Sequence, residues 1–352
     1  MKFGPREITD NPVSLLAVAA VAGFLASFSA SNAQPAQTYV MKLSTATVND
    51  TQQEWLQRFG AAVEKDSGGR IKPQIYNGSK LGSIPRQIEG TQFGSIQAWI
   101  GPPEFLVGVD ERYEALSAPG LFTSQEQDVR TLNDPQVRDL MLGLGANKGL
   151  AGIAIMPTAP SAIVVRKETH HLDEFKGMKI RVLASPFQLE MIKRMDASPV
   201  AMSLGDVLPA LQQGAVDGAL GTISVFVPLH YSDATKFMVE NGQPFVNVVV
   251  VMNKKWLDDL PADLQKIVRD DATTVTTGIL PFVKNFYFAQ RKAWMDQGGK
   301  LIEFPADEQA AYLANISSIG SDLSKDKPAL SAAVKTVMDS AARNKVTVAQ
   351  NK

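Results

Sequence analysis

A single arginine lies inside a short apolar stretch in the middle of the chain. Arg181 is near the carboxyl end of a predicted strand at 179–183. In open α/β sheets, ligands bind beyond the carboxyl ends of the strands. A guanidinium is planar and always charged, so it can hold a carboxylate through two parallel hydrogen bonds. Arg181 is therefore a candidate anchor for an acidic ligand, although its position equally allows an internal ion pair with Asp206 or Asp217.

Signatures of catalysis and of metal binding are missing from the sequence. It contains no G-x-S-x-G, H-E-x-x-H, Walker A or EF-hand pattern. The chain has no cysteine, which excludes disulfides, thiolate metal sites, Fe–S clusters and cysteine nucleophiles. Two of its three histidines, His170 and His171, are neighbours in a predicted polar loop, and the glycines of 143–149 fit a helix end better than a phosphate loop. We therefore expect no cofactor, no metal site and a binding protein in place of an enzyme.

Length and charge narrow the class of protein further. The chain has 352 residues, 45% of them hydrophobic and 20% charged, which is enough for about two domains with a buried core. Its 35 Lys and Arg nearly balance 36 Asp and Glu. This neutrality argues against nucleic acid or an anionic membrane surface as the main partner.

The first 33 residues have the pattern of a secretory signal peptide. Lys2 and Arg6 precede an apolar segment at 13–28, and Ser31 and Ala33 supply the small residues of a cleavage site. An uncleaved membrane anchor is the alternative. The pattern favours cleavage and a periplasmic location, which suits a chain without cysteine.

Strands and helices alternate along the rest of the chain. The alternation predicts an α/β fold with mostly parallel sheets. Asn49 or Asp50 is expected to cap a helix that ends near Gly68. The helical pattern at 261–297 would be roughly 55 Å long, so it is better interpreted as a strut across two lobes, with a kink at Pro281. Further helices are predicted at 307–344 and a flexible tail at 346–352. The other expected strands lie at 39–44, 70–76, 95–100, 152–156, 162–166, 218–221 and 246–252, and the other helices at 85–93, from 135 on, 186–195 and 204–213.

The segment Leu172–Gly218 resembles the solute receptors of tripartite ATP-independent periplasmic (TRAP) transporters, the DctP-type family. The family's D-L-K-G-x-K-x-R is similar to the stretch EFKGMKIR at 174–181. Its G-A-x-P-x-x-M turn is similar to DASPVAM at 196–202, and its E-V-x-x-A-L-Q-x-G-x-V-D-G to DVLPALQQGAVDG at 206–218. A second similar stretch runs from Arg70 to Gln97, so that the resemblance covers most of the mature chain.

The resemblance implies a two-lobed periplasmic binding protein fold, type II-like, with a long strut helix crossing both lobes. The lobes would comprise 38–158 with 248–280, and 159–247 with 281–345. Arg181 matches the arginine that clamps the substrate carboxylate in the family. Plain turns or core packing are the alternatives for the other matched positions. The other ligand contacts that the resemblance suggests are Thr45, Thr47, Trp99, Pro102, Ser161, Phe187, Leu204, Gly221 and Gln243.

Departures from the family's pattern make the predicted site less polar. Gly221 stands where the family commonly has an asparagine that touches the ligand, and no arginine lies between Ala151 and Val165. Gln243 lies where some members have a histidine. We therefore expect a hydrophobic or aromatic monocarboxylate as ligand, in preference to a sugar acid. The resemblance further implies a monomer that delivers its ligand to a TRAP membrane permease; a secreted enzyme acting on a small carboxylate in the same cleft is the alternative.

Overall fold

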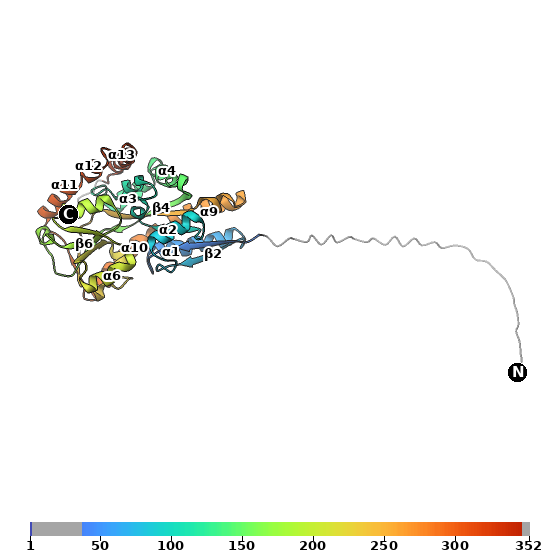
Figure 1. The fold of residues 1–352 in the computed structure, drawn as a ribbon, viewed down its shortest axis with the longest axis horizontal. Helices are drawn as coiled ribbons and strands as arrows, with labels where there is room; N and C mark the ends of the chain where they lie inside the picture. The colour runs from blue at the N-terminus through green and yellow to red at the C-terminus, as the bar shows by residue number, and fades with distance from the viewer. Residues whose placement is uncertain (2–36, 347–352) are drawn as a thin grey trace. The chain divides into compact units, whose positions relative to one another are not determined.

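The structure, a computed structural model, describes Met1 and residues 37–346. From Thr38 on, the chain forms one compact unit with two β-sheets and helices packed around them (Figure 1). Apart from Met1 and Val346, the predicted signal peptide and C-terminal tail lie outside the described residues. Within the described part, no helix has both the length and the apolarity needed to cross a bilayer.

The first sheet has five strands in the order β2-β1-β3-β10-β4. β1 is parallel to β2 and β3, whereas β10 is antiparallel to β3 and β4. All nine residues of β10 are buried, as its run of β-branched residues predicts. The bounds are β1 Tyr39–Ser44, β2 Ile71–Tyr76, β3 Ala98–Gly101, β4 Leu150–Pro160 and β10 Phe245–Asn253.

The second sheet has six strands in the order β11-β9-β5-β8-β6-β7. β6 is parallel to β7 and β8, and β5 is antiparallel to β8 and β9. The bounds are β5 Ala162–Val165, β6 Lys179–Val182, β7 Ser198–Ala201, β8 Gly218–Gly221, β9 Phe237–Val239 and β11 Lys300–Ile302. The expectation of mostly parallel sheets is thus corrected: both are mixed. Only Ser161 separates β4 from β5, so the chain passes straight from one sheet into the other without the helical crossover that parallel pairing requires.

Local sequence signals account for the first helix, α1 (Thr51–Asp66). The Asp50 side chain accepts hydrogen bonds from the backbone N–H groups of Gln52 and Gln53, at 3.1 and 3.0 Å, which confirms the predicted cap. The expected apolar stripe of Trp55, Phe59 and Val63 is fully buried. This stripe packs α1 against the first sheet. The helices α2 (Ile84–Phe93) and α8 (Lys254–Asp258) also contact strands of this sheet.

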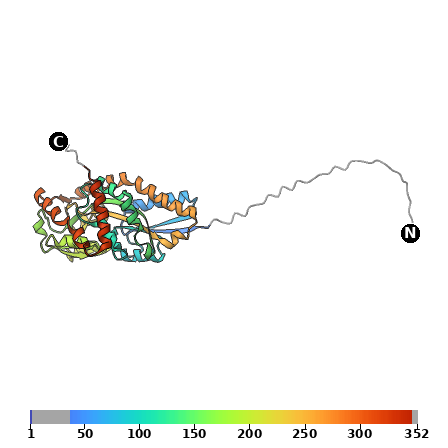
Figure 2. The ribbon, with the colours of Figure 1, turned by 90° about the horizontal axis from the view of Figure 1, so that it is seen from above.

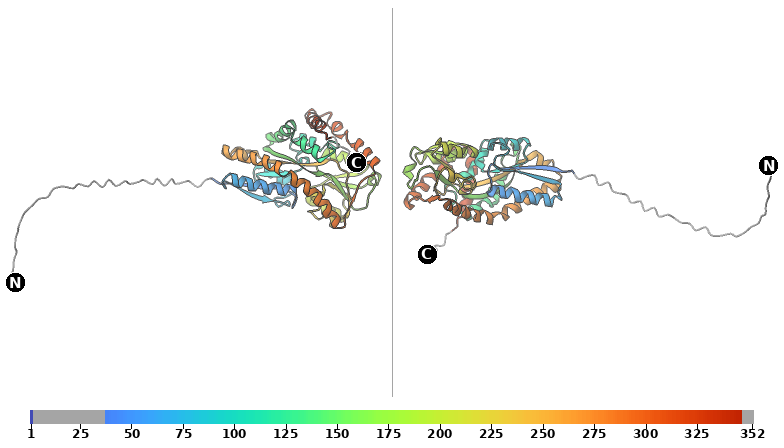
Figure 3. Two further views of the ribbon diagram at one scale, coloured as in Figure 1. Left: turned by 180° about the vertical axis from the view of Figure 1, so that it is seen from behind. Right: turned by 90° about the horizontal axis from the view of Figure 1, so that it is seen from below.

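The predicted strut consists of two consecutive helices, α9 (Ala262–Gly278) and α10 (Leu280–Asp296), drawn in orange in Figure 3. The break is at Ile279, two residues before the expected kink at Pro281, because a proline in the first turn of α10 cannot continue the hydrogen bonding of α9. α9 packs on α1 and β4, whereas α10 also contacts β11 and the short helix α7 (Ile223–Phe226). The pair therefore runs along both sheets.

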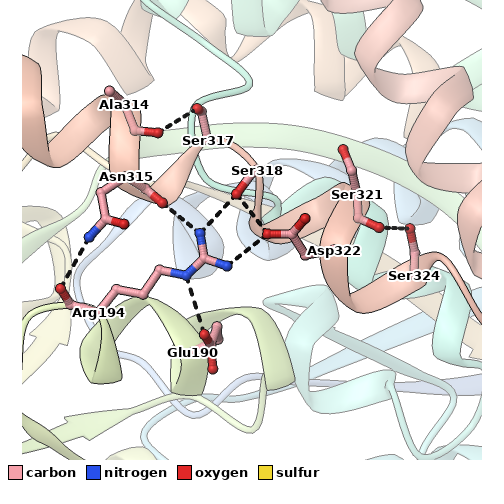
Figure 4. Close-up of polar contacts among 9 residues, drawn as sticks. All are labelled: Glu190, Arg194, Ala314, Asn315, Ser317, Ser318, Ser321, Asp322 and Ser324. Atoms are coloured by element: carbon pink, nitrogen blue, oxygen red, sulfur yellow. Dashed lines mark hydrogen bonds and ion pairs between the residues drawn. The ribbon is translucent and has the colours of Figure 1, made fainter.

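Three C-terminal helices, α11 (Ala306–Ile316), α12 (Ile319–Ser324) and α13 (Pro328–Arg343), complete the unit (Figure 2). α13 packs on α3 (Gln125–Leu132), on α4 (Pro135–Gly143) and on the 3-10 helix η2 (Glu111–Ser117). Arg194 connects α12 to α5 (Pro186–Lys193), as Figure 4 shows. Its guanidinium donates to Asp322 Oδ2 at 2.8 Å, Ser318 Oγ at 2.9 Å and the Asn315 carbonyl at 2.6 Å.

Candidate functional site

A cavity of about 570 Å³, including space that is open to solvent, lies beyond the carboxyl ends of strands from both sheets. Thr47 follows β1, Pro102 follows β3, Leu183 follows β6 and Thr222 follows β8. These strand ends are where an α/β fold places its ligands. Strand ends from both sheets thus line one cavity.

Arg181 is the one charged side chain among the described residues that line this cavity. It is only 2% exposed. Its Nε donates to the Met202 carbonyl and its Nη1 to the Leu220 carbonyl, both at 3.0 Å. One N–H of Nη1 and both N–H groups of Nη2 have no such partner among the described residues, so the end of the fork is free to hold an anion.

The alternative of an internal ion pair does not occur in the structure. Asp217 accepts a hydrogen bond from the backbone N–H of Lys179 at 2.8 Å, and Asp206 is exposed. Burial lowers the pKa of Arg181 to about 10, partly offset by attraction to the ionised forms of Tyr231 and Glu104. Arg181 therefore stays protonated at neutral pH, as a buried cation without an ion-pair partner among the described residues.

Six of the predicted ligand-contact residues lie together. Besides Arg181, the cavity is lined by Thr47, Trp99, Pro102, Leu204 and Gly221. Thr45 lies directly behind this wall, since its Oγ1 is 3.0 Å from Thr47 Oγ1 and 3.2 Å from Gln52 Oε1. Their roles as ligand contacts remain predictions.

Three predicted contacts lie elsewhere. The Ser161 hydroxyl donates to Asn241 Oδ1 at 3.3 Å, on the connection between the two sheets. The side chain of Gln243 accepts from the backbone N–H of Gly120 at 3.0 Å and donates to the Phe122 carbonyl at 2.6 Å. Phe187, in the first turn of α5, is 1% exposed and belongs to the apolar core. Ser161 thus bonds another side chain, Gln243 bonds two backbone groups, and Phe187 fills the core.

Gly221 provides space for an aromatic ring. A Cβ atom at this position would lie 2.7 Å from Cζ of Phe226, well inside van der Waals contact. Phe226, on α7, also lines the cavity. The tip of the Phe226 ring therefore occupies the region where a longer side chain at 221 would extend. Sequence reasoning missed Phe226 because a four-residue helix has no periodic pattern.

The remaining walls are mostly apolar. Other apolar side chains that sequence reasoning missed are Ile84, Ile100, Phe105, Leu183, Val225 and Val246. Besides Arg181, the polar side chains on the walls are Thr47, Gln52, Thr158 and Thr222, and Trp99 adds an indole N–H that has no hydrogen-bond partner among the described residues. The Thr158 hydroxyl is already used, because it donates to the Val246 carbonyl at 2.6 Å. No nucleophile paired with a base lines the cavity within residues 37–346; the arrangement suits the binding of one anionic group and an apolar body.

Part of the missed lining could have been found from the sequence. Gln52 is in the first turn of a helix whose cap the sequence identifies, directly after the predicted contacts at 45 and 47. His170 and His171 are exposed, as expected for a polar loop. Among the described residues, no three His, Asp or Glu side chains gather in a way that could hold a metal ion.

Comparisons with known proteins agree with this geometry. The model of the DctP family, described as bacterial extracellular solute-binding protein, family 7, matches residues 43–325. The C4-dicarboxylate-binding periplasmic protein DctP of Rhodobacter capsulatus is 24% identical over 285 residues, which cover 79% of this chain and 84% of that protein. The protein YiiZ of Salmonella typhimurium is 25% identical over 65% of this chain and 70% of its own length.

Solved structures share the fold. A TRAP periplasmic solute binding protein from Desulfovibrio salexigens with bound orotic acid superposes with a TM-score of 0.83, at 20% identity, over 88% of this chain and 100% of that one. The sugar acid binding protein DctPAm from Advenella mimigardefordensis, in complex with galactonate, also gives 0.83, at 19% identity, over 88% and 99%. The two-lobed α/β fold expected from the sequence is thereby confirmed.

Proposed function

Since the chain belongs to the DctP family of bacterial extracellular solute-binding proteins, we propose that it binds a monocarboxylate with a hydrophobic or aromatic body and delivers it to a TRAP-type membrane permease. Family membership makes the protein a solute receptor and not an enzyme. The observation that carries the ligand class is a single buried cation, Arg181, in a cavity whose other walls are largely apolar.

The free end of the Arg181 fork supports a carboxylate as the anchored group. Its unpaired N–H groups match the two oxygens of a carboxylate in one plane. A bound carboxylate would also neutralise a cation that is costly to bury. A second carboxylate would find no further Lys or Arg among the described lining residues, which disfavours a dicarboxylate.

The ring of Phe226 beside Gly221 supports an apolar or aromatic body. An aromatic ring gains from packing on such a wall. A ligand hydroxyl, by contrast, loses its water and finds few partners there. Among similar structures, one holds orotic acid and another galactonate, so this fold accommodates both an aromatic and a polyhydroxylated acid.

We further propose that cleavage after Ala33 releases the protein into the periplasm as a monomer. The two predicted lobes would close on the ligand by hinge motion about the strand connections. The position of the cavity between strand ends of both sheets supports this. Closure then presents one surface from both lobes to the permease.

A thermal-shift panel tests the ligand class. Purified mature protein is mixed with benzoate, orotate, galactonate and benzamide, the last being a neutral analogue of benzoate. We expect saturable stabilisation by benzoate, little by galactonate and none by benzamide. Stabilisation by galactonate alone would refute the apolar ligand class, and equal stabilisation by benzamide would refute a carboxylate anchor.

A further inference from the structure

Two buried carboxylic acids lie behind the wall of the cavity. Glu104, on the 3-10 helix η1 (Pro103–Leu106), and Glu114, on η2, are each 1% exposed. The Oε2 atom of each acid has no hydrogen-bond partner among the described residues, and neither acid forms an ion pair there. A carboxylate buried in this way is costly, so each group holds its proton more tightly than in water.

One side chain connects Glu104 to the wall of the site. Gln188 donates from Nε2 to Glu104 Oε1 at 3.1 Å, and its own Oε1 accepts from the backbone N–H of Leu183, also at 3.1 Å. Leu183, two residues after Arg181, lines the cavity. Phe105, which follows Glu104 in the sequence, also lines it. Glu104 is therefore one side chain away from the cavity wall at Leu183 and is separated from solvent.

Glu104 and Arg181 influence each other's charge through this dry interior. Burial raises the pKa of Glu104 to about 7, and attraction to Arg181 is one of the effects that limit the rise. The pKa of Glu114 is also raised to about 7: burial and the charge of Glu104 raise it, whereas hydrogen bonds from Ser185 and the Phe187 backbone and the charge of Lys327 lower it. Tyr231 is the other titratable group that interacts with Arg181, and its pKa is raised to about 12, so it stays neutral.

We propose that Glu104 takes up a proton when a carboxylate binds to Arg181. This inference rests on the proposed function. Without ligand, an ionised Glu104 partly offsets the charge of Arg181. A bound carboxylate neutralises Arg181 and adds a like charge near Glu104, so that an ionised Glu104 would leave a net negative charge in a medium of low dielectric constant. Protonation of Glu104 restores neutrality.

Calorimetry measures this proton directly. Benzoate is titrated into the full protein at about pH 7.5, in phosphate, HEPES and Tris buffers, and the dependence of the heat on the buffer's ionisation enthalpy gives the protons taken up. We expect about 0.3–1 proton per benzoate, and an affinity that falls up to about tenfold per pH unit above pH 7. Glu104→Gln, which keeps an acceptor for Gln188, should abolish the uptake and flatten the pH profile. Glu114→Gln is the matched control and should retain proton uptake.

Each outcome separates this inference from the proposed function. Benzoate that binds to the wild type without proton uptake overturns the role of Glu104 and leaves the receptor function intact. Uptake that persists in Glu104→Gln, or that disappears only in Glu114→Gln, also overturns it. If Glu104→Gln does not fold, two measurements on the wild type still test the proton uptake. They are the slope of the binding heat against the buffer's ionisation enthalpy, and the ¹³C chemical shifts of the glutamate carboxyl groups with and without benzoate. Failure of benzoate to bind at all would refute the proposed apolar ligand class, and this inference with it.

Discussion

Replacing Arg181 with methionine removes the cation but keeps most of the side chain's volume. Burial lowers the pKa of Arg181 to about 10, which is about 2.5 units below its ordinary value. At 1.36 kcal/mol per pKa unit, burying the Arg181 cation costs the ligand-free protein about 3 kcal/mol of free energy. A bound carboxylate relieves this cost. We therefore expect Arg181→Met to weaken benzoate binding by about 100-fold, measured by isothermal titration calorimetry.

The same substitution should leave the protein folded. It removes two charge-assisted hydrogen bonds, to the carbonyls of Met202 and Leu220, each contributing about 1.5–3 kcal/mol. It also removes the cost of burying the cation, which is of similar size. The net loss of unfolding free energy is therefore about 0–3 kcal/mol, and loss of binding in a folded variant would reflect loss of the anchor. A urea titration of the ligand-free variant checks this.

Arg194→Met is the matched control. Arg194 has a comparable set of hydrogen bonds, but these join α5 to the C-terminal helices away from the cavity (Figure 4). Its side chain is 20% exposed, and we expect its loss to destabilise the protein by about 1–3 kcal/mol without changing the affinity for benzoate. An Arg181→Met protein that binds benzoate within about fivefold of wild type would refute Arg181 as the anchor.

Two further substitutions test other parts of the reasoning. Gly221→Asn places a Cβ 2.7 Å from the ring of Phe226, so it should displace the ring and weaken benzoate binding. The double variant Gly221→Asn, Phe226→Ala should gain affinity for galactonate. Thermal shift measures both effects. Asp128→Asn tests a buried acid whose pKa burial raises to about 8. Because the folded pKa lies above that of the unfolded chain, about 4, this contribution to stability is fully present below about pH 4 and is lost progressively as the pH rises to about 8. The variant, which keeps a polar partner for Asn247, should therefore lose less stability than wild type between about pH 4 and 8 in urea titrations, and parallel pH profiles would contradict this.

Signals confined to one element predicted that element well. The Asp50 cap, the buried stripe of α1 and the interrupted strut each follow from residues a few positions apart. The family motif likewise gave the position of Arg181, because a strand end in an α/β sheet fixes where its side chains can go. The predicted kink at Pro281 was two residues away from the observed break at Ile279, because a proline constrains the residue before it as well as its own turn.

Features that depend on how the chain passes between the two sheets could not be predicted in the same way. Ser161 and Gln243 lie on connections between the sheets, where the rotation of the backbone decides whether a side chain meets the cavity or a neighbouring carbonyl. Phe226 and Glu104 reach the site from short helical segments without periodicity. Their contacts join residues distant in the sequence, such as Glu104 to Gln188. A single sequence carries no record of such contacts.

The walls, and not the arginine, decide which carboxylate this receptor prefers. An arginine anchor serves every carboxylate, so its contribution cancels when two ligands are compared. Burying about 120 Å² of an aromatic ring against Phe226 and its apolar neighbours stabilises the complex by about 3 kcal/mol. A sugar acid gains less from these walls and loses about 1–3 kcal/mol for each hydroxyl that finds no partner. Thr158 is already bonded to a backbone carbonyl, which leaves Thr47, Gln52, Thr222 and the indole N–H of Trp99 as polar groups besides Arg181 on the described walls. An aromatic acid should therefore bind at least about 100-fold more tightly than a sugar acid of the same size.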